Sequence, residues 1–372
     1  MSAAVDLLAE LVRTDTVADR EGALARHCAE LLADAGHTVS LVSWQDGREQ
    51  LVTRAGNPAT PLTLTGHLDT VPADASGWSV DPWAAETDGD RMHGRGTSDM
   101  KSGVAAALVA ATQHAANPHE CRGVQVVLTA GEETGCTGAR HIPADSLATG
   151  GPLVVAEPTA NRLVPGHKGA LWLRVTAAGV AAHGSAPELG DNAAVRLGRA
   201  AVALHDYADW PHDPTFGPVT ANVGLLCGGV QPNVVPDRAE MLLDLRTVPG
   251  ADAAELRDVV ARLCGDEVTV EDHVVLPVVH TADDSPFLGS MREALASCGQ
   301  PDEPQAPARF FTDASVLADL LAEPGAEAVP TVVLGPGEPD QCHVADEWCS
   351  TSRVDMAVEI YRAVLDHWCA GR

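Results

Sequence analysis

The chain has 372 residues, of which 52 are acidic and 24 basic, so its formal charge is −28. This balance argues against nucleic-acid binding, which needs basic patches on phosphate, and indicates an acidic surface facing water. An apolar share of 45% suffices for a buried core, no stretch reaches the roughly 18 apolar residues of a membrane span, and the length predicts about two or three domains.

The cysteines and the N-terminus predict the compartment. Residues 1–6 carry neither a basic run nor an apolar stretch, so we expect no signal peptide. The nine cysteines are scattered and form no CxxC pair, which favours a reduced, cytoplasmic protein. Cys342, beside His343, is interpreted as a small packing residue.

Helices and strands alternate through the first part of the chain. Apolar spacing predicts helices over 3–13, 20–35 and 102–116, and strands over 38–42, 50–53, 61–65, 123–130 and 153–156. The last three strands each run into polar residues, and α/β enzymes hold ligands at such strand ends. The alternation predicts an α/β fold whose mainly parallel sheet is covered by helices on both sides.

The pattern changes near Gly166. We expect strands over 171–177, 220–226, 239–246 and 268–279, with helices over 192–208 and 251–264. After residue 280 the helix–strand pattern resumes, and a buried strand over 330–334 leads toward His343. This predicts an α+β domain, residues 167–279, inserted into a first domain made of residues 1–166 and 280–372.

Five short segments carry imidazole or carboxylate groups, the ligands that zinc-like ions prefer, in loop-forming surroundings. They are Gly66–Asp69, Gly96–Gly103, Gly131–Gly135, Ala156–Thr159 and Gln341–His343. Each alone has an ordinary reading: a solvated turn for His67 and Asp69, a helix cap for Asp99, an exposed acidic turn for Glu132 and Glu133. Together they predict a two-metal hydrolase site.

The spacing suggests a division of labour within that site. We expect His67 to bind metal while Asp69 accepts a hydrogen bond from its other ring nitrogen, and Asp99 to bridge two ions. Adjacent Glu132 and Glu133 point to opposite sides on extended backbone, so one can bind metal and the other can take a proton from water. Chain position sorts the ligands into one set of His67, Asp99 and Glu157, and another of Glu133, Asp99 and His343.

The order of these motifs resembles the co-catalytic zinc deacylase and exopeptidase family that contains acetylornithine deacetylase, succinyl-diaminopimelate desuccinylase, aminoacylases and glutamate carboxypeptidases. The similarity covers nearly the whole chain: HxD, GRGxxDMKxG, GEExG, EPT, HKG, HGSxP, NVVPD, DLR, TDA and GPG…xHxxDEW. It implies two zinc ions, for which cobalt can substitute, with Glu132 as general base. It also implies that the inserted domain is a lid and dimerisation domain.

The resemblance implies further site residues as well. His183 matches the histidine that polarises the scissile carbonyl or its oxyanion, often from the partner subunit of a dimer. Substrate contacts are implied at four positions: Arg246, Asn233, Lys168 and Thr312. From sequence alone, a surface arginine and a loop histidine are the plain alternatives for Arg246 and His183, although an arginine fork suits a substrate carboxylate and a loop histidine suits an oxyanion.

These observations predict a metal-dependent amidohydrolase that removes the acyl group from an N-acyl amino acid. The alternatives are a dipeptidase or carboxypeptidase, and a non-catalytic relative that binds an amino-acid-like ligand or a carrier protein; retention of all ligands and Glu132 argues against the latter. Two-metal phosphoester cleavage uses similar ions, but the carboxylate-anchoring arginine disfavours it. Two departures bear on the substrate: Phe310 and Phe311 precede Thr312 where some branches have glycines, and Cys342 stands where a small residue is common.

Overall fold

The structure is a computed structural model that describes residues 2–17, 19–56, 59–115 and 123–369. Its contacts divide the chain into two compact units. Unit 1 comprises residues 1–166, 279–306 and 312–372, and unit 2 comprises residues 167–278 and 307–311. Residues 307–311, which the sequence leads us to expect in the first domain, group with unit 2 instead. The last residue of the helix expected over 102–116 lies outside the described residues.

Unit 1 is built on a six-stranded sheet with the strand order β1-β2-β6-β3-β7-β16. The strands are β1 (Thr38–Gln45), β2 (Arg48–Ala55), β3 (Leu62–His67), β6 (Val124–Thr129), β7 (Leu153–Val155) and β16 (Thr331–Val333). Neighbours from β6 through β16 pair in parallel, whereas β2 runs antiparallel to β1 and to β6. The predicted mixed, mostly parallel sheet is therefore confirmed.

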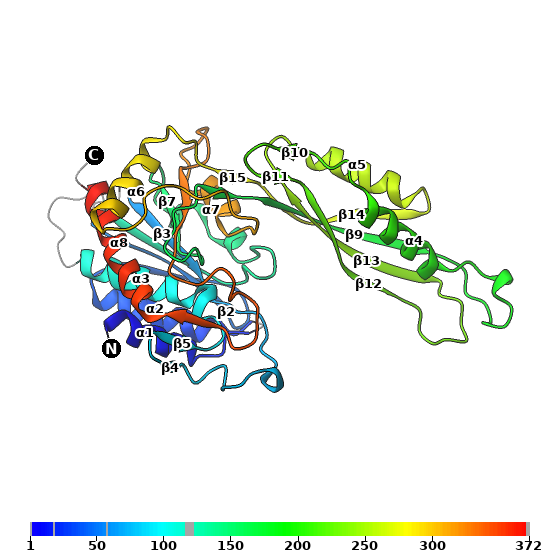
Figure 1. The fold of residues 1–372 in the computed structure, drawn as a ribbon, viewed down its shortest axis with the longest axis horizontal. Coiled ribbons are helices and arrows are strands. Elements are labelled where there is room, and N and C mark those ends of the chain that lie inside the picture. Colours follow the sequence, from blue (N-terminus) through cyan, green and yellow to red (C-terminus); the bar gives the residue numbers. More distant parts are fainter. Residues whose placement is uncertain (1, 18, 57–58, 116–122, 370–372) are drawn as a thin grey trace. The chain divides into compact units, whose positions relative to one another are not determined.

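Helices cover this sheet and complete the core. They are α1 (Ala3–Val12), α2 (Gly22–Asp34), α3 (Ser102–Ala115), α6 (Pro286–Ser297), α7 (Ala314–Leu320) and α8 (Thr351–Cys369). Alanine-rich α3 packs against β3, β6 and α8, while α7 packs against β7, and α1, α2, α3 and α8 gather beside one another in Figure 1. All residues of β3 and β6 are buried, because both faces of a central parallel strand are covered by other elements.

Short strands and single helical turns occur in the segments between the long elements. β17 (Trp348–Ser350), β5 (Arg91–His93) and β4 (Glu86–Asp88) form a three-stranded sheet, and β8 (Gly166–His167) pairs with β15 (Val279–His280). Single helical turns occur at η1 (Ala75–Gly77), η3 (Ala139–His141), η4 (Ala144–Ser146) and η5 (Pro187–Leu189), and a distorted turn, η2 (Thr97–Lys101), leads into α3.

Unit 2 has a four-stranded antiparallel sheet with two helices. The sheet order is β12-β13-β9-β14, with β9 (Gly169–Ala178), β12 (Thr220–Gly228), β13 (Arg238–Thr247) and β14 (Val268–Leu276). The helices are α4 (Ala193–Asp206) and α5 (Ala253–Cys264), and β10 (His212–Asp213) pairs with β11 (Gly217–Pro218). Alternate residues of β13 are buried, as expected of a sheet with helices on one face. The inserted α+β element pattern is thus present.

None of the helices in the described part of the chain is both long and apolar enough to cross a membrane.

Candidate metal centre

The carboxyl ends of adjacent parallel strands in unit 1 deliver the predicted ligands. His67 is the last residue of β3, Glu132 and Glu133 follow β6, and Glu157 follows β7. These three strands are neighbours in the sheet, so the side chains emerge at one edge. This is the position at which open α/β sheets bind ligands.

The carboxylate of Asp99 lies between two histidines. Its Oδ1 is 3.1 Å from Nε2 of His67, and its Oδ2 is 3.3 Å from Nε2 of His343. Glu133 is 3.1 Å from the same nitrogen of His343, and Glu157 is 3.8 Å from that of His67. A single carboxylate that faces two separate imidazoles with its two oxygens has the arrangement of a bridging ligand.

The ligand atoms are close enough together for metal coordination. Two groups have ligand atoms that all lie within 4.8 Å of one another: His67, Asp99 and Glu133; and His67, Glu132 and Glu157. The five predicted ligands and Glu132 therefore come from five separate chain segments into one cluster. They offer only imidazole nitrogens and carboxylate oxygens, a donor set suited to zinc-like ions.

The carboxylates of this cluster lie close together and need positive charge to balance them. Burial raises the pKa of Glu157, and the negative charge of Asp99 raises it further. Burial likewise opposes ionisation of Asp99, yet hydrogen bonds with His343 and His67 hold the pKa of this carboxyl below its usual range. Hydrogen bonds to Asp99 and Glu133 raise the pKa of His343 to about 10. Protons on the histidines thus balance the carboxylates, and divalent cations fit the same place.

Glu132 is buried beside the other acids. Burial raises the pKa of its carboxyl well above the ordinary value, and the carboxylates of Glu157 and Glu133 raise it further, against the lowering effect of His67. A carboxyl with this elevated proton affinity, whose oxygen lies within 4.8 Å of ligand atoms of His67 and Glu157, is suited to accept and return a proton.

The sequence predicts that the carboxylate of Asp69 accepts a hydrogen bond from His67, but in the structure the backbone carbonyl of Asp69 takes that place. The Nδ1 atom of His67 lies 2.9 Å from the backbone carbonyl oxygen of Asp69, but 3.7 Å from its carboxylate. Because a carbonyl only accepts, Nδ1 carries the proton and leaves Nε2 directed at Asp99. The Asp69 carboxylate instead accepts the backbone N–H groups of Gly131, Glu132 and Glu133 at 2.8, 3.2 and 3.1 Å.

Thr312 is fully buried in unit 1. Its hydroxyl oxygen accepts the backbone N–H of Ala314 at 3.1 Å, at the start of α7. Next to it, the buried Asp313 carboxylate accepts a hydrogen bond from Thr129, and burial raises the pKa of Asp313 to about 6. Asp313 belongs to the TDA motif, so the sequence did mark this position, but we predicted no role for it.

In unit 2, the hydrogen bonds of His183 determine which nitrogen carries its proton. Its Nδ1 accepts the backbone N–H of Ser185 at 3.1 Å and lies 2.7 Å from the Ser185 hydroxyl. Since a backbone N–H can only donate, Nδ1 is unprotonated, and the neutral ring carries its proton on Nε2. His183 is therefore a hydrogen-bond donor at Nε2. The backbone carbonyl of Asn233 accepts the backbone N–H of Gly184 at 2.7 Å.

Arg246 is held by two neighbours within unit 2. Its Nε donates to Asp244 Oδ2 at 3.0 Å, and its guanidinium carbon lies 4.7 Å from the centre of the Phe311 ring. These contacts engage Nε and one face of the guanidinium, and neither uses its two terminal nitrogens. Lys168, by contrast, is buried and donates its amine to the backbone carbonyl of Pro218.

Comparison with known proteins identifies the family. Residues 63–367 match the sequence model of Peptidase family M20/M25/M40. The chain belongs to this family. As an M20 protein it is a metallohydrolase, and the expected resemblance is confirmed.

Individual M20 proteins resemble the chain along nearly its whole length. The acetylornithine deacetylase of Aliivibrio salmonicida (strain LFI1238) is 30% identical over 371 residues, which cover 96% of this chain and 94% of the relative. Among solved structures, the M20 metallo-carboxypeptidase Sso-CP2 of Sulfolobus solfataricus has a TM-score of 0.79 at 18% identity, with 99% of each chain covered. The di-peptidase Dug1p of Saccharomyces cerevisiae also has a TM-score of 0.79, at 14% identity, with 98% of this chain and 95% of its own covered. At these identities the two structures support the fold alone.

Proposed function

We propose that this M20 protein removes the acyl group from an N-acyl amino acid by hydrolysis of the amide, with two zinc ions that cobalt can replace. The observation that carries the proposal is the Asp99 carboxylate between His67 and His343, with Glu132 beside it. The acetylornithine deacetylase relatives favour this substrate class.

The proposed ligands form two sets that share Asp99. His67 and Glu157 complete one set, and Glu133 and His343 complete the other. Divalent ions bound there polarise the substrate carbonyl and lower the pKa of water. Each set leaves coordination positions for water and substrate, as catalytic sites require.

The chain's own residues then move the proton and stabilise charge. Glu132 accepts the proton of the attacking water and passes it to the leaving amine. Donation from Nε2–H of His183 stabilises the oxyanion of the tetrahedral intermediate. Arg246 binds a substrate carboxylate through its terminal nitrogens, in the two-bond geometry that a guanidinium favours.

We also propose roles in the substrate site for the three remaining predicted contacts, Asn233, Lys168 and Thr312. Asn233 is exposed beside the His183 loop, which supports a contact through its side chain. Lys168 and Thr312 already make hydrogen bonds inside their own units. We therefore propose that they support the residues around the substrate rather than bind it directly.

Peptide-bond cleavage is the second candidate, because a carboxypeptidase and a di-peptidase share this fold. A substrate panel separates the two functions. After chelation and reloading with zinc or cobalt, we expect N-acetyl or N-succinyl amino acids to be hydrolysed at a higher kcat/KM than dipeptides. Faster hydrolysis of dipeptides would assign the chain to the peptidases, and full activity in protein shown to be metal-free would refute the mechanism.

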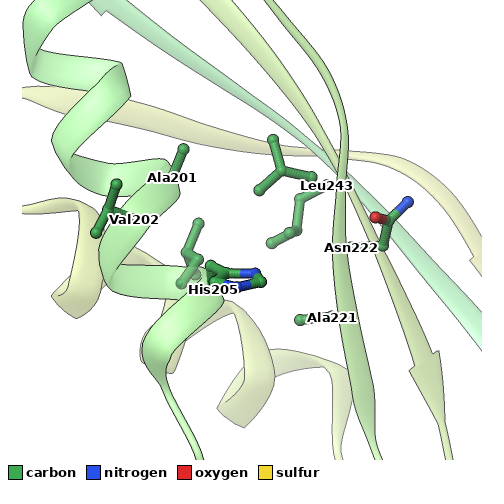
Figure 2. A pocket seen from close by; sticks show the side chains of 8 residues that line it. Ala201, Val202, His205, Ala221, Asn222 and Leu243 are labelled. Atoms are coloured by element: carbon green, nitrogen blue, oxygen red, sulfur yellow. The ribbon is translucent and has the colours of Figure 1, made fainter.

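We also propose a homodimer through unit 2. The edge strand β12 exposes Leu225 and Leu226, and α4 exposes Val195 and Val202. A pocket of about 310 Å³ lies between α4 and β12, and Figure 2 shows the ring of His205 directed from the helix toward the strands. An exposed apolar strand edge is a site for strand pairing, and a second copy offers the same edge in an isologous contact.

Sedimentation tests the dimer. Wild-type protein is expected to sediment as a dimer and Val202→Glu as a monomer with reduced turnover, if His183 acts on the partner's substrate. A fully active monomer would remove that role of His183.

We further propose a cytoplasmic location. The eight cysteines in the described residues are all free thiols, which supports this proposal.

A further inference from the structure

Glu347 is the most completely enclosed acid near the metal centre, and the mechanism does not use it. Its side chain is 0% exposed, and it is four residues beyond His343 in the same loop. A buried carboxylate is unfavourable unless its oxygens are hydrogen-bonded. The partners of Glu347 therefore indicate what this carboxylate does.

Both oxygens of Glu347 accept hydrogen bonds from the loop that carries Asp99. Oε1 accepts the backbone N–H groups of Ser98 and Asp99 at 2.8 and 3.1 Å. Oε2 accepts the backbone N–H of Gly96 at 3.0 Å and a charged donor, Nη1 of Arg95, at 2.7 Å. Three backbone N–H groups and one guanidinium of the same loop therefore bond to one carboxylate, so the position of the Asp99 backbone depends on Glu347.

Additional bonds attach the same two loops to each other around this carboxylate. The backbone N–H of Gly94 donates to the carbonyl of Glu347 at 2.9 Å, and the Ser98 hydroxyl donates to the carbonyl of Trp348 at 2.8 Å. Directly afterwards, Trp348 begins β17, which pairs with β5 just before the Asp99 loop. One loop presents Asp99 and the other presents His343, whose side chains are 3.3 Å apart.

We propose that Glu347 is a positioning residue for the metal centre, because its carboxylate fixes the loop of Asp99 in register with the loop of His343. Within the described part of the chain, its carboxylate bonds to backbone N–H groups and to Arg95 rather than to the side chain of a proposed metal ligand. The backbone N–H groups of Ser98 and Asp99 face Glu347, while the Asp99 carboxylate faces the two histidines. Groups that orient metal ligands in this way typically change metal affinity or activity by about 10–100-fold when they are replaced. The inference rests on the metal centre proposed above.

Glu347→Gln tests this role with almost no change in shape. The amide keeps one accepting oxygen, but its NH2 group faces two donors and cannot accept from them. We expect zinc and cobalt to bind about 10–100-fold more weakly in calorimetric titrations. The visible absorption of the cobalt form should also change, because the Asp99 and His343 ligands shift.

Glu338→Gln is the matched control. Glu338 is a buried acid of the same loop whose carboxylate pairs with Arg353, while its backbone N–H donates to Ser98 Oγ in the Asp99 loop. Its variant should bind metal within about twofold of wild type. A merely structural role of Glu347 would lower the melting temperature of Glu347→Gln and leave metal affinity and the cobalt spectrum unchanged, which would overturn the proposal.

A second variant covers the case in which Glu347→Gln does not fold. Glu347→Asp keeps both oxygens and the charge but withdraws them by one methylene, so we expect metal affinity between those of wild type and Glu347→Gln. Wild-type affinity in a folded Glu347→Asp would also overturn the inference. Wild-type protein that binds no stoichiometric zinc or cobalt would instead refute the metal centre itself, and this inference with it.

Discussion

The carboxylate of Asp69 accepts the backbone N–H of Glu132 at 3.2 Å, so the proposed base is held in place by a neighbour that does not contact its side chain. The same carboxylate binds the N–H groups of Gly131 and Glu133. Asp69 thereby defines the course of the backbone from β6 into the site.

Asp69→Asn is expected to lower kcat much more than metal affinity. The amide cannot accept three N–H groups, so the Glu132 loop moves, and a displacement of about 1 Å can reduce turnover roughly 100-fold. The carbonyl contact to His67 remains, so zinc affinity measured by calorimetry should stay within a few-fold of wild type. Asp88→Asn, at an exposed position, serves as the control. A large loss of metal affinity with kcat intact at saturating zinc would mean that the carboxylate acts on His67 after all.

Glu132→Gln should retain metal and lose most turnover. Gln occupies the same volume but cannot accept a proton from water, and general-base catalysis typically contributes about 100–10,000-fold. Metal content measured by atomic absorption should stay near that of wild type, since Glu132 lies outside both proposed ligand sets. Glu188→Gln, on the surface of unit 2, should change neither quantity. A near-wild-type rate in Glu132→Gln would show that another group takes the proton.

Much of this site follows from sequence because its ligands stand directly after buried strands. His67 ends a fully buried strand, and Glu133 and Glu157 each follow one, and parallel strands bring such ends to one edge. Strand-end position was therefore enough to place His67, Glu133 and Glu157 together and to predict the mostly parallel sheet, whereas Asp99 and His343 were found through the loop segments that carry them. The resemblance supplied the role of Glu132.

Contacts between segments distant in sequence could not be predicted in the same way. Whether the carbonyl or the carboxylate of Asp69 faces His67 depends on a backbone path that residue spacing does not determine. Glu347 joins a loop about 250 residues earlier in the chain, and the motif that contains it gives no sign of its partner. Residues 307–311 lack regular periodicity, and they group with unit 2 through a bridge to His167 and contacts of Phe311 with Arg246.

Phe311→Leu should weaken substrate binding without changing the chemical step. The Phe311 ring and Asp244 hold the Arg246 guanidinium from two sides, and cation–π contacts are worth about 0.5–2 kcal/mol. For the best substrate of the panel, KM should rise about 2–30-fold with kcat nearly constant, the pattern of lost uniform binding. Arg246→Lys should raise KM more, because lysine cannot form the paired hydrogen bonds.

Phe310→Leu is the matched control for that series. It removes a neighbouring ring for which no contact to Arg246 is found among the described residues, and its KM should equal that of wild type. Phe311→Tyr keeps the ring and should behave like wild type. Equal KM values for Phe311→Leu and Phe310→Leu would show that the contact of the Phe311 ring with Arg246 does not support substrate binding.

His167 should make the stability of the enzyme depend on pH. Burial and the charge of Arg246 together lower the pKa of His167 from 6.5 to about 4, against a hydrogen bond to the Lys168 carbonyl at 2.9 Å. Above pH 6.5 the ring is neutral in both folded and unfolded chains. Between pH 6.5 and 4 the unfolded chain binds the proton first, so the free energy of unfolding falls; below about 4 the folded protein binds it as well and the loss stops.

Comparison of wild type with His167→Asn isolates this contribution. The asparagine amide can still donate to the Lys168 carbonyl but does not titrate. Between pH 7.5 and 5.0, wild type should lose roughly 2 kcal/mol more of its free energy of unfolding than the variant does, measured by urea denaturation of the metal-loaded protein. His212→Asn, at an exposed histidine of the same unit, should follow wild type. Parallel pH dependence of wild type and His167→Asn would mean that His167 is protonated as readily in the folded protein as in the unfolded chain.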